Sequence, residues 1–278
     1  MGALLSVASA ACYGVVDFAG GLLSRRAHFA VVTVLGQIGG LLLALAAAVL
    51  VPAAAVRSPD VWWGALSGAG SGTAMFCLNR GLARGAMSVV VPVSAVTGVA
   101  LSVLCGVFFL GDRPVLAAWL GICVTVPALW LVSGGIGPGG DRRALADGLL
   151  ASSGIAVQYI GLAQADPASG LWPVAAGRLA AVLLLLPGAL RQVPRFRRPP
   201  GLLAEAVAVG AGAAFALILY LRAAQLQMPA VAVVLASLYP AVPVVLGVAV
   251  LREKLTRAQV TGLVGAAAAI VLLTLGGG

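Results

Sequence analysis

The chain has 278 residues, of which 62% are hydrophobic and only 9% are charged, and its mean hydropathy is +1.10. A soluble domain is about half apolar and about a quarter charged, so this composition excludes a water-soluble globular protein and indicates a polytopic membrane protein. The net charge of +9 does not indicate nucleic-acid binding, because the basic residues lie in short connections between apolar runs.

Ten apolar runs follow one another, each long enough to cross a hydrocarbon core about 30 Å thick as a helix of about 20 residues. They cover residues 3–22, 29–51, 61–79, 86–110, 115–133, 146–164, 170–189, 201–221, 229–251 and 258–275. A polar, glycine-rich stretch at 134–145 divides them into five and five. We therefore expect two repeats, 1–133 and 146–278, joined by this linker.

One stretch, from Asn79 to Ser133, occurs a second time from Leu221 onward. Each copy contains an apolar helix, a hairpin with an acidic residue (Asp112 or Glu253), and another apolar helix. Weak internal symmetry in an apolar chain is typical of transporters built from two repeats. Because five helices per repeat is an odd number, the second repeat enters the membrane from the opposite side. The predicted fold class is an all-α integral membrane protein with ten transmembrane helices in two inverted five-helix repeats.

The basic residues gather in alternate connections, as the predicted helix count requires. Of the 17 Lys and Arg residues, 13 lie after the first, third, fifth, seventh or ninth helix. Three lie after the even-numbered helices (Arg57, Arg113 and Arg222), and Arg178 lies inside the seventh helix. The positive-inside rule places the basic side in the cytoplasm and both termini outside it. The expected location is the cell (inner) membrane.

The chain resembles the drug/metabolite transporter superfamily, specifically the ten-helix transporters with two EamA domains. The resemblance covers essentially the whole chain and rests on three features of each repeat. They are a short stretch with an arginine before the fourth or ninth helix, a proline within that helix, and an acidic residue in the hairpin that follows. The first repeat has Arg80-Gly81-Leu82, Pro92 and Asp112, and the second has Arg222-Ala223-Ala224, Pro240 and Glu253. The resemblance implies cytoplasmic termini, which is the reverse of the charge pattern, and we base the predicted orientation on the charges.

Ionisable groups inside a span are the first candidates for a functional site, because they are expensive in lipid. Asp17, with Tyr13 one turn before it on the same face, is a candidate substrate-amine contact or proton carrier. The alternative is a structural carboxylate that bonds Arg25 or a neighbouring helix end. Arg178 is either a clamp for an anionic substrate or part of a structural ion pair, for example with Asp17. Gln158, near the position equivalent to Asp17, lines the same cavity or makes an ordinary interhelical hydrogen bond.

The two prolines of the resemblance, Pro92 and Pro240, are candidate helix kinks, because a proline frees one helical carbonyl. A tolerated kink without a functional role is the alternative. The resemblance further implies that helices 3, 4, 8 and 9, with parts of 1 and 6, surround a central cavity. On that basis alone, five polar residues are candidate lining residues: Asn79, Ser94, Thr97, Tyr220 and Tyr239.

The predicted function is secondary active transport, in the export direction, of a small metabolite, amino acid-like solute or drug by alternating access. Proton coupling through Asp17 is a hypothesis. The chain contains no GxxxxGK[ST] motif, no CxxC pair and no HExxH, so we expect no ATP-binding site, cofactor or metal. The alternatives are a flippase for a lipid or lipid-linked carrier and an intramembrane enzyme. The expected partners are a small-molecule substrate and the lipid bilayer, with no nucleic acid, and the chain acts as a monomer or homodimer.

Overall fold

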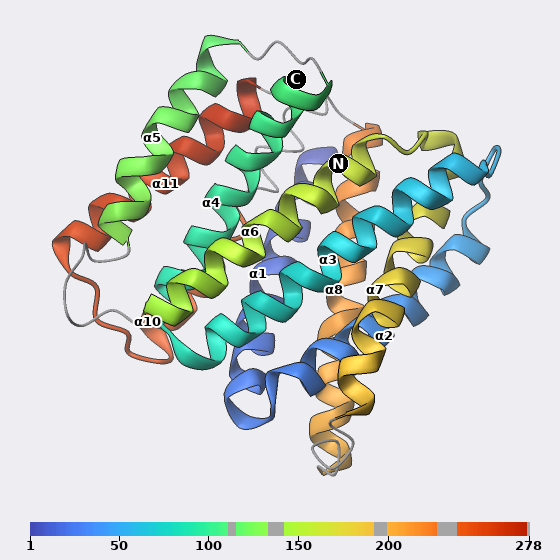
Figure 1. Ribbon diagram of the computed structural model, residues 1–278, viewed down its shortest axis with the longest axis horizontal. Helices are drawn as coiled ribbons and strands as arrows, with labels where there is room; N and C mark the ends of the chain where they lie inside the picture. The colour runs from blue at the N-terminus through green and yellow to red at the C-terminus, as the bar shows by residue number, and fades with distance from the viewer. Residues whose placement is uncertain (111–114, 133–141, 192–198, 227–237, 277–278) are drawn as a thin grey trace.

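The computed structural model describes residues 1–110, 115–132, 142–191, 199–226 and 238–276. Within these ranges the fold is all-α (Figure 1). The α-helices are α1 (Gly2–Arg26), α2 (Phe29–Leu50), α3 (Ser58–Arg84), α4 (Met87–Cys105), α5 (Leu116–Val132), α6 (Arg142–Ala163), α7 (Trp172–Leu190), α8 (Pro200–Leu226), α10 (Ala241–Ala249) and α11 (Arg257–Gly276). The π-helical turn η1 (Gly106–Leu110) continues α4, and the 3-10 helix η2 (Pro167–Ser169) precedes α7.

Each described α-helix overlaps one of the predicted apolar runs. Among the described helices, α1, α2, α4, α6, α7 and α8 are long and apolar enough to cross a membrane, whereas α5 and α11 are apolar but shorter. The ninth predicted run, 229–251, is represented by α10, and its residues 229–237 lie outside the described residues. The helix α6 begins at Arg142, inside the stretch predicted as linker.

Many large apolar side chains face outward, and the interior holds small and polar residues beside its apolar core. Leu42, Trp62 and Leu183 are exposed, whereas Ser9, Ser71 and many alanines are buried. This distribution suits a chain surrounded by lipid, where small residues and interhelical hydrogen bonds help the helices to pack. Composition, helix lengths and this outward apolar surface together define a multi-pass membrane protein.

Two groups of helices form the centre of the molecule. In the first, which we call the α8 bundle, α1 and α2 both pack along α8. In the second, the α3 bundle, α6 and α7 both pack along α3, and α4 packs along α6. The short α10 lies between α1 and α4, while α5 and α11 lie side by side at the edge of the molecule and contact α4 (Figure 1).

Glycines allow the closest helix contacts within these bundles. A Cβ atom on Gly68 of α3 would collide with the carbonyl oxygen of Gly177 on α7. Equivalent crowding would follow at Gly210 of α8, which lies against the backbone of Gly36 on α2. The backbones therefore touch directly at these two crossings, as in small-residue contacts of membrane helices.

Two ionic clusters lie at one end of the molecule, which we call the basic end. Arg25, at the end of α1, contacts the α3–α4 turn and Glu253, which lies between α10 and α11. Arg80 and Arg84, at the end of α3, form ion pairs with Asp147 on α6, with closest N–O distances of 2.7 and 3.0 Å. Because α1 ends and α11 begins at this end, both chain termini lie at the opposite end (Figure 1).

Candidate functional site

A polar cavity of about 80 Å³ lies between the two bundles. Its lining residues come from α1, α2, α3, α6, α7 and α8: Tyr13, Val16, Asp17, Gly36, Gln37, Ser71, Met75, Gln158, Arg178, Val209, Gly210 and Ala213. A smaller cavity of about 20 Å³ adjoins it and shares Ser71, Gln158 and Arg178. The smaller cavity also touches Pro173 and Leu217, so the polar interior extends from Asp17 toward the end of the molecule opposite the basic end.

Arg178 lies in the second turn of α7 and is only 7% exposed. One guanidinium nitrogen, Nη1, donates a hydrogen bond of 3.0 Å to Oε1 of Gln37 on α2. Gly40, one turn beyond Gln37, makes room for the arginine side chain, because a Cβ atom there would lie 3.3 Å from Arg178 Cδ and Nε. The guanidinium has five N–H donors in a fixed plane. Among the described residues, the bond to Gln37 uses one of these donors and leaves others available to a group in the cavity.

Asp17 lines the same cavity from α1 and is 8% exposed. In the described part of the chain, its carboxylate accepts no hydrogen bond and forms no ion pair within 4.0 Å. Asp17 and Arg178 therefore form no ion pair among the described residues, and Arg178 donates instead to the neutral amide of Gln37. In the same described ranges Asp17 makes no bond to Arg25, whose guanidinium contacts carbonyl oxygens and Glu253 at the basic end.

The structure brings two further predicted residues to the cavity and places a third beside it. Tyr13 and Gln158 line the cavity from α1 and α6. The backbone carbonyl of Gln158 accepts a hydrogen bond of 2.9 Å from Ser67 Oγ, which fixes α6 against α3. Tyr239, just before α10, packs its ring against that of Tyr13, with the ring centroids 6.0 Å apart. Tyr239 therefore reaches the cavity through Tyr13 and does not line it directly.

Other candidates lie away from the cavity. Asn79 Nδ2 donates a hydrogen bond of 3.0 Å to Thr33 Oγ1 and so joins α3 to α2. Tyr220 packs into an apolar cluster formed by α2, α7 and α8. On α4, Ser94 Oγ bonds the carbonyl of Val91 in its own helix. Thr97 Oγ1 is buried without a partner among the described residues, and it lines neither cavity.

The two prolines differ in position. Pro92 lies inside α4, as predicted, whereas Pro240 is the N-cap of α10 and precedes that helix. The helices around the cavity also differ from those implied by the resemblance. The helix α4 contributes no lining residue, and α2 and α7 contribute several. Sequence reasoning did not select Gln37, although it is the only strongly polar side chain in an otherwise apolar α2, and that isolation was the available signal.

A cavity with ionisable and polar side chains, surrounded by apolar helices, is typical of integral membrane transporters. A solved structure described as "Crystal structure of protein" shares the fold, with a TM-score of 0.58 and 16% identity over 99% of this chain and 98% of that one. The chain belongs to the EamA-like transporter family, whose profile matches residues 1–134 and 143–275 as two EamA repeats. A search of curated proteins found no match. The protein is therefore a membrane transporter and not an enzyme.

Proposed function

We propose that the protein is a secondary active transporter that exports a small solute by alternating access. The observation that carries the proposal is the shared cavity of Asp17 and Arg178, which is enclosed by helices of both repeats. Ionisable groups at membrane depth that face an internal cavity are typical of a substrate or ion pathway. Among the solutes predicted from the sequence, an amino acid-like molecule suits this cavity best.

The chemistry of the cavity supports this choice. Arg178 offers a planar set of donors to a substrate carboxylate, and Asp17 offers a carboxylate to a substrate ammonium group. Neither group has an opposite charge within 4.0 Å in the described chain. One water occupies about 15 Å³ of such space, so the larger cavity holds about five waters or one small solute. This size supports a solute over the lipid or lipid-linked carrier of the flippase alternative.

Alternating access would follow from inverted repeats, 1–133 and 146–278. The packing supports this arrangement, because the main contacts of α8 have counterparts in those of α3 when the repeats are exchanged. The pair α1 and α8 corresponds to α6 and α3, and the pair α2 and α8 corresponds to α7 and α3. Two such related bundles can rock about a fixed central site. We further propose that Asp17 carries the coupling proton, and that the basic end faces the cytoplasm, with both termini outside it.

The test is solute flux in proteoliposomes, screened with small amino acids, polyamines, purines and cationic drugs, with and without a pH gradient. We expect at least one amino acid to be transported faster with the gradient, and we expect Asp17→Asn to lose that acceleration. Glu205→Gln is the matched control, because this carboxylate is exposed on α8 and outside the cavity. An Asp17→Asn protein that keeps the full response to the gradient would remove Asp17 from the coupling step.

A further inference from the structure

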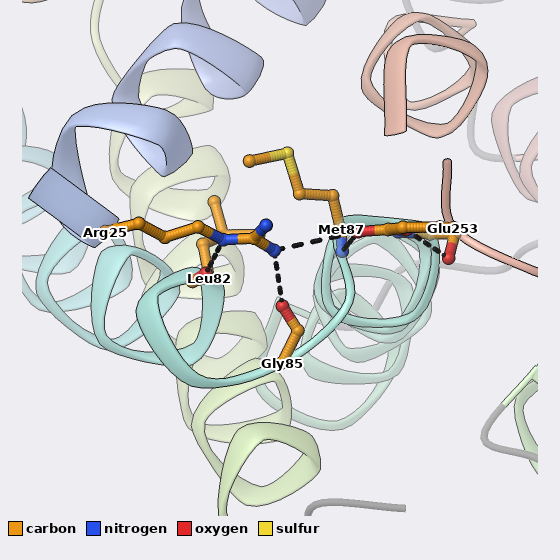
Figure 2. A network of polar contacts seen from close by, with 6 residues as sticks. Arg25, Leu82, Gly85, Met87 and Glu253 are labelled. Atoms are coloured by element: carbon orange, nitrogen blue, oxygen red, sulfur yellow. Dashed lines mark hydrogen bonds and ion pairs between the residues drawn. The ribbon is translucent and has the colours of Figure 1, made fainter. Parts of the chain in front are cut away.

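Arg25 joins the two bundles at the basic end. It lies in the last turn of α1, in the α8 bundle, and its guanidinium reaches across to the α3–α4 turn of the α3 bundle. Its Nε donates to the carbonyl of Leu82 at 3.1 Å, and its Nη2 donates to the carbonyl of Gly85 at 2.9 Å. The same Nη2 lies 3.6 Å from Oε1 of Glu253 (Figure 2). One side chain thus contacts both the end of α3 and the segment between α10 and α11.

Glu253 completes this junction from the hairpin between α10 and α11. Its two carboxylate oxygens accept hydrogen bonds from the backbone N–H groups of Met87 and Ser88, at 2.9 and 3.0 Å, and Oε2 also accepts from Ser88 Oγ at 2.6 Å (Figure 2). These are the free N–H groups of the first turn of α4, where a negative charge is favoured. Gly247 leaves the space for this carboxylate, because a Cβ atom there would lie 3.0 Å from Glu253 Oε2.

The second ionic cluster at the basic end has a different geometry. Arg80 and Arg84 pair with Asp147 between α3 and α6, which belong to the same bundle. These two helices also touch backbone to backbone, since Gly70 and Gly154 face each other. Movement of one bundle against the other leaves this cluster intact. The bonds of Arg25 to Leu82 and Gly85, in contrast, must break if the bundles separate at this end.

An apolar layer lies between the cavity and this junction. Met75 lines the cavity and also packs against a buried cluster that includes Phe18, Leu82 and Met87. Leu82 is seven residues beyond Met75 on α3, which places it about 10 Å nearer the basic end. At the opposite end, the described residues of α2, α7 and α8 meet through an apolar cluster that contains Ala44, Val174 and Leu217. The charged junction between bundles therefore lies on one side of the cavity.

We propose that Arg25 and Glu253 form a gate at the basic end. While the guanidinium holds Leu82, Gly85 and Glu253, the path from the cavity to this end is closed. Release of Arg25 from these acceptors lets the α8 bundle and the α3 bundle separate there. The proposal rests on the alternating-access function proposed above, and it assigns the closed side of this structure.

Site-directed labelling tests the gate without knowledge of the substrate. Ser71→Cys, in a background with the four native cysteines replaced by alanine, places one thiol in the cavity. A membrane-impermeant methanethiosulfonate is applied to vesicles that hold the protein in one orientation or the other, so that the reagent reaches one end of the molecule at a time. Adding Arg25→Gln removes the charged link that α1 makes to the α3–α4 turn but keeps the bonds of Glu253 to α4. We expect labelling from the basic end to become about tenfold faster, with slower labelling from the opposite end.

Asp147→Asn is the matched control, since it removes a buried carboxylate with two arginine partners from the same end but within one bundle. We expect lower thermal stability and no change in the sidedness of labelling. If Arg25→Gln changes stability alone and leaves both labelling rates unchanged, the network is only a helix cap and the gate is wrong. A shift in labelling without any solute flux would support the gate and contradict the proposed transport function. Failure of the gate and failure of the proposed function are therefore distinguishable.

Discussion

At the scale of single residues, the charge of Arg178 in the cavity depends on its uncharged hydrogen-bond partner, Gln37. Gln37 supplies an acceptor without supplying a charge, so the guanidinium is oriented but its positive charge is not neutralised. A carboxylate in the place of this amide would form a charge-assisted pair with Arg178 in a buried setting. The difference between an amide and a carboxylate at position 37 therefore decides whether Arg178 remains available to an anionic group.

Gln37→Glu should weaken binding of a solute that carries a carboxylate. The new carboxylate competes for Arg178, so we expect the KM of flux to rise about tenfold or more, while the maximal rate changes less. Initial rates over a range of solute concentrations measure both quantities. Gln164→Glu is the control, because Gln164 is exposed beyond the end of α6. An unchanged KM for Gln37→Glu would show that Arg178 does not contact the solute.

At the scale of helices, direct backbone contact fixes how the elements of each bundle meet. The contact of Gly68 on α3 with Gly177 on α7 leaves no room for a side chain. Lipid offers no hydrophobic driving force between helices, so close packing of this kind carries much of their association. Each bundle should accordingly behave as a rigid unit, with motion confined to the surface between bundles.

Gly68→Ala should destabilise the protein by about 2 kcal/mol or more, because the added methyl group forces α3 and α7 apart. Thermal unfolding in detergent measures the effect as a lower Tm. Gly188→Ala is the matched control on α7, since a Cβ atom there meets nothing within 4 Å. Alanine at that helical position should be neutral or stabilising by about 0.5–1 kcal/mol. Equal Tm values for the two variants would contradict the assigned packing.

The loops at the opposite end should give the protein a specific sensitivity to acid. Asp60, one residue before the predicted span of α3, accepts hydrogen bonds from the Asp166 backbone N–H at 3.0 Å and from Ser169 Oγ at 2.7 Å. These bonds lower the pKa of Asp60 below its ordinary value. The ionised carboxylate therefore stabilises the fold above the unfolded pKa, about 3.9, and this contribution is lost as the pH falls through the lower folded pKa.

We expect the Tm of the wild type to fall more steeply than that of Asp60→Asn between pH 5 and pH 3. Thermal unfolding of both proteins across this range in one detergent measures the difference. The comparison isolates Asp60, because the other carboxylates titrate in both proteins. Parallel curves would mean that the Asp60 hydrogen bonds contribute no stability that depends on pH.

For the whole molecule, the helices were predictable because a bilayer imposes a simple rule on length and polarity. Apolar runs of about 20 residues must become helices, whatever their neighbours are. The connections between these runs are marked by proline, glycine and charged residues, so they too can be read from a short stretch of sequence. The start of α6 at Arg142 was missed because the two arginines there read as loop, whereas in the structure they form the first turn of the helix.

The candidate site was predictable only where the signal was a residue type and not a contact. Asp17 and Arg178 stand out because they are ionisable within apolar helices, and the structure places both in one cavity. The groups that surround Asp17 and Arg178 depend on which helices pack together, and no local sequence pattern specifies that packing. Asn79 was assigned to the cavity by resemblance, yet its rotation on α3 turns it to Thr33. The role of Gln37 likewise arises only when α2 crosses α7.

The capping of α4 by Glu253 has a consequence for biosynthesis. The N–H groups of Met87 and Ser88 find their acceptor in a residue that is made 165 or more positions later. At a synthesis rate of about 5–20 residues per second, the ribosome reaches this glutamate on the order of 10–30 s after α4 itself. The first turn of α4 is therefore completed only after all the helices that line the cavity have been made. A nascent chain that stops before the last hairpin contains the cavity helices but lacks the carboxylate that fixes the α3–α4 turn.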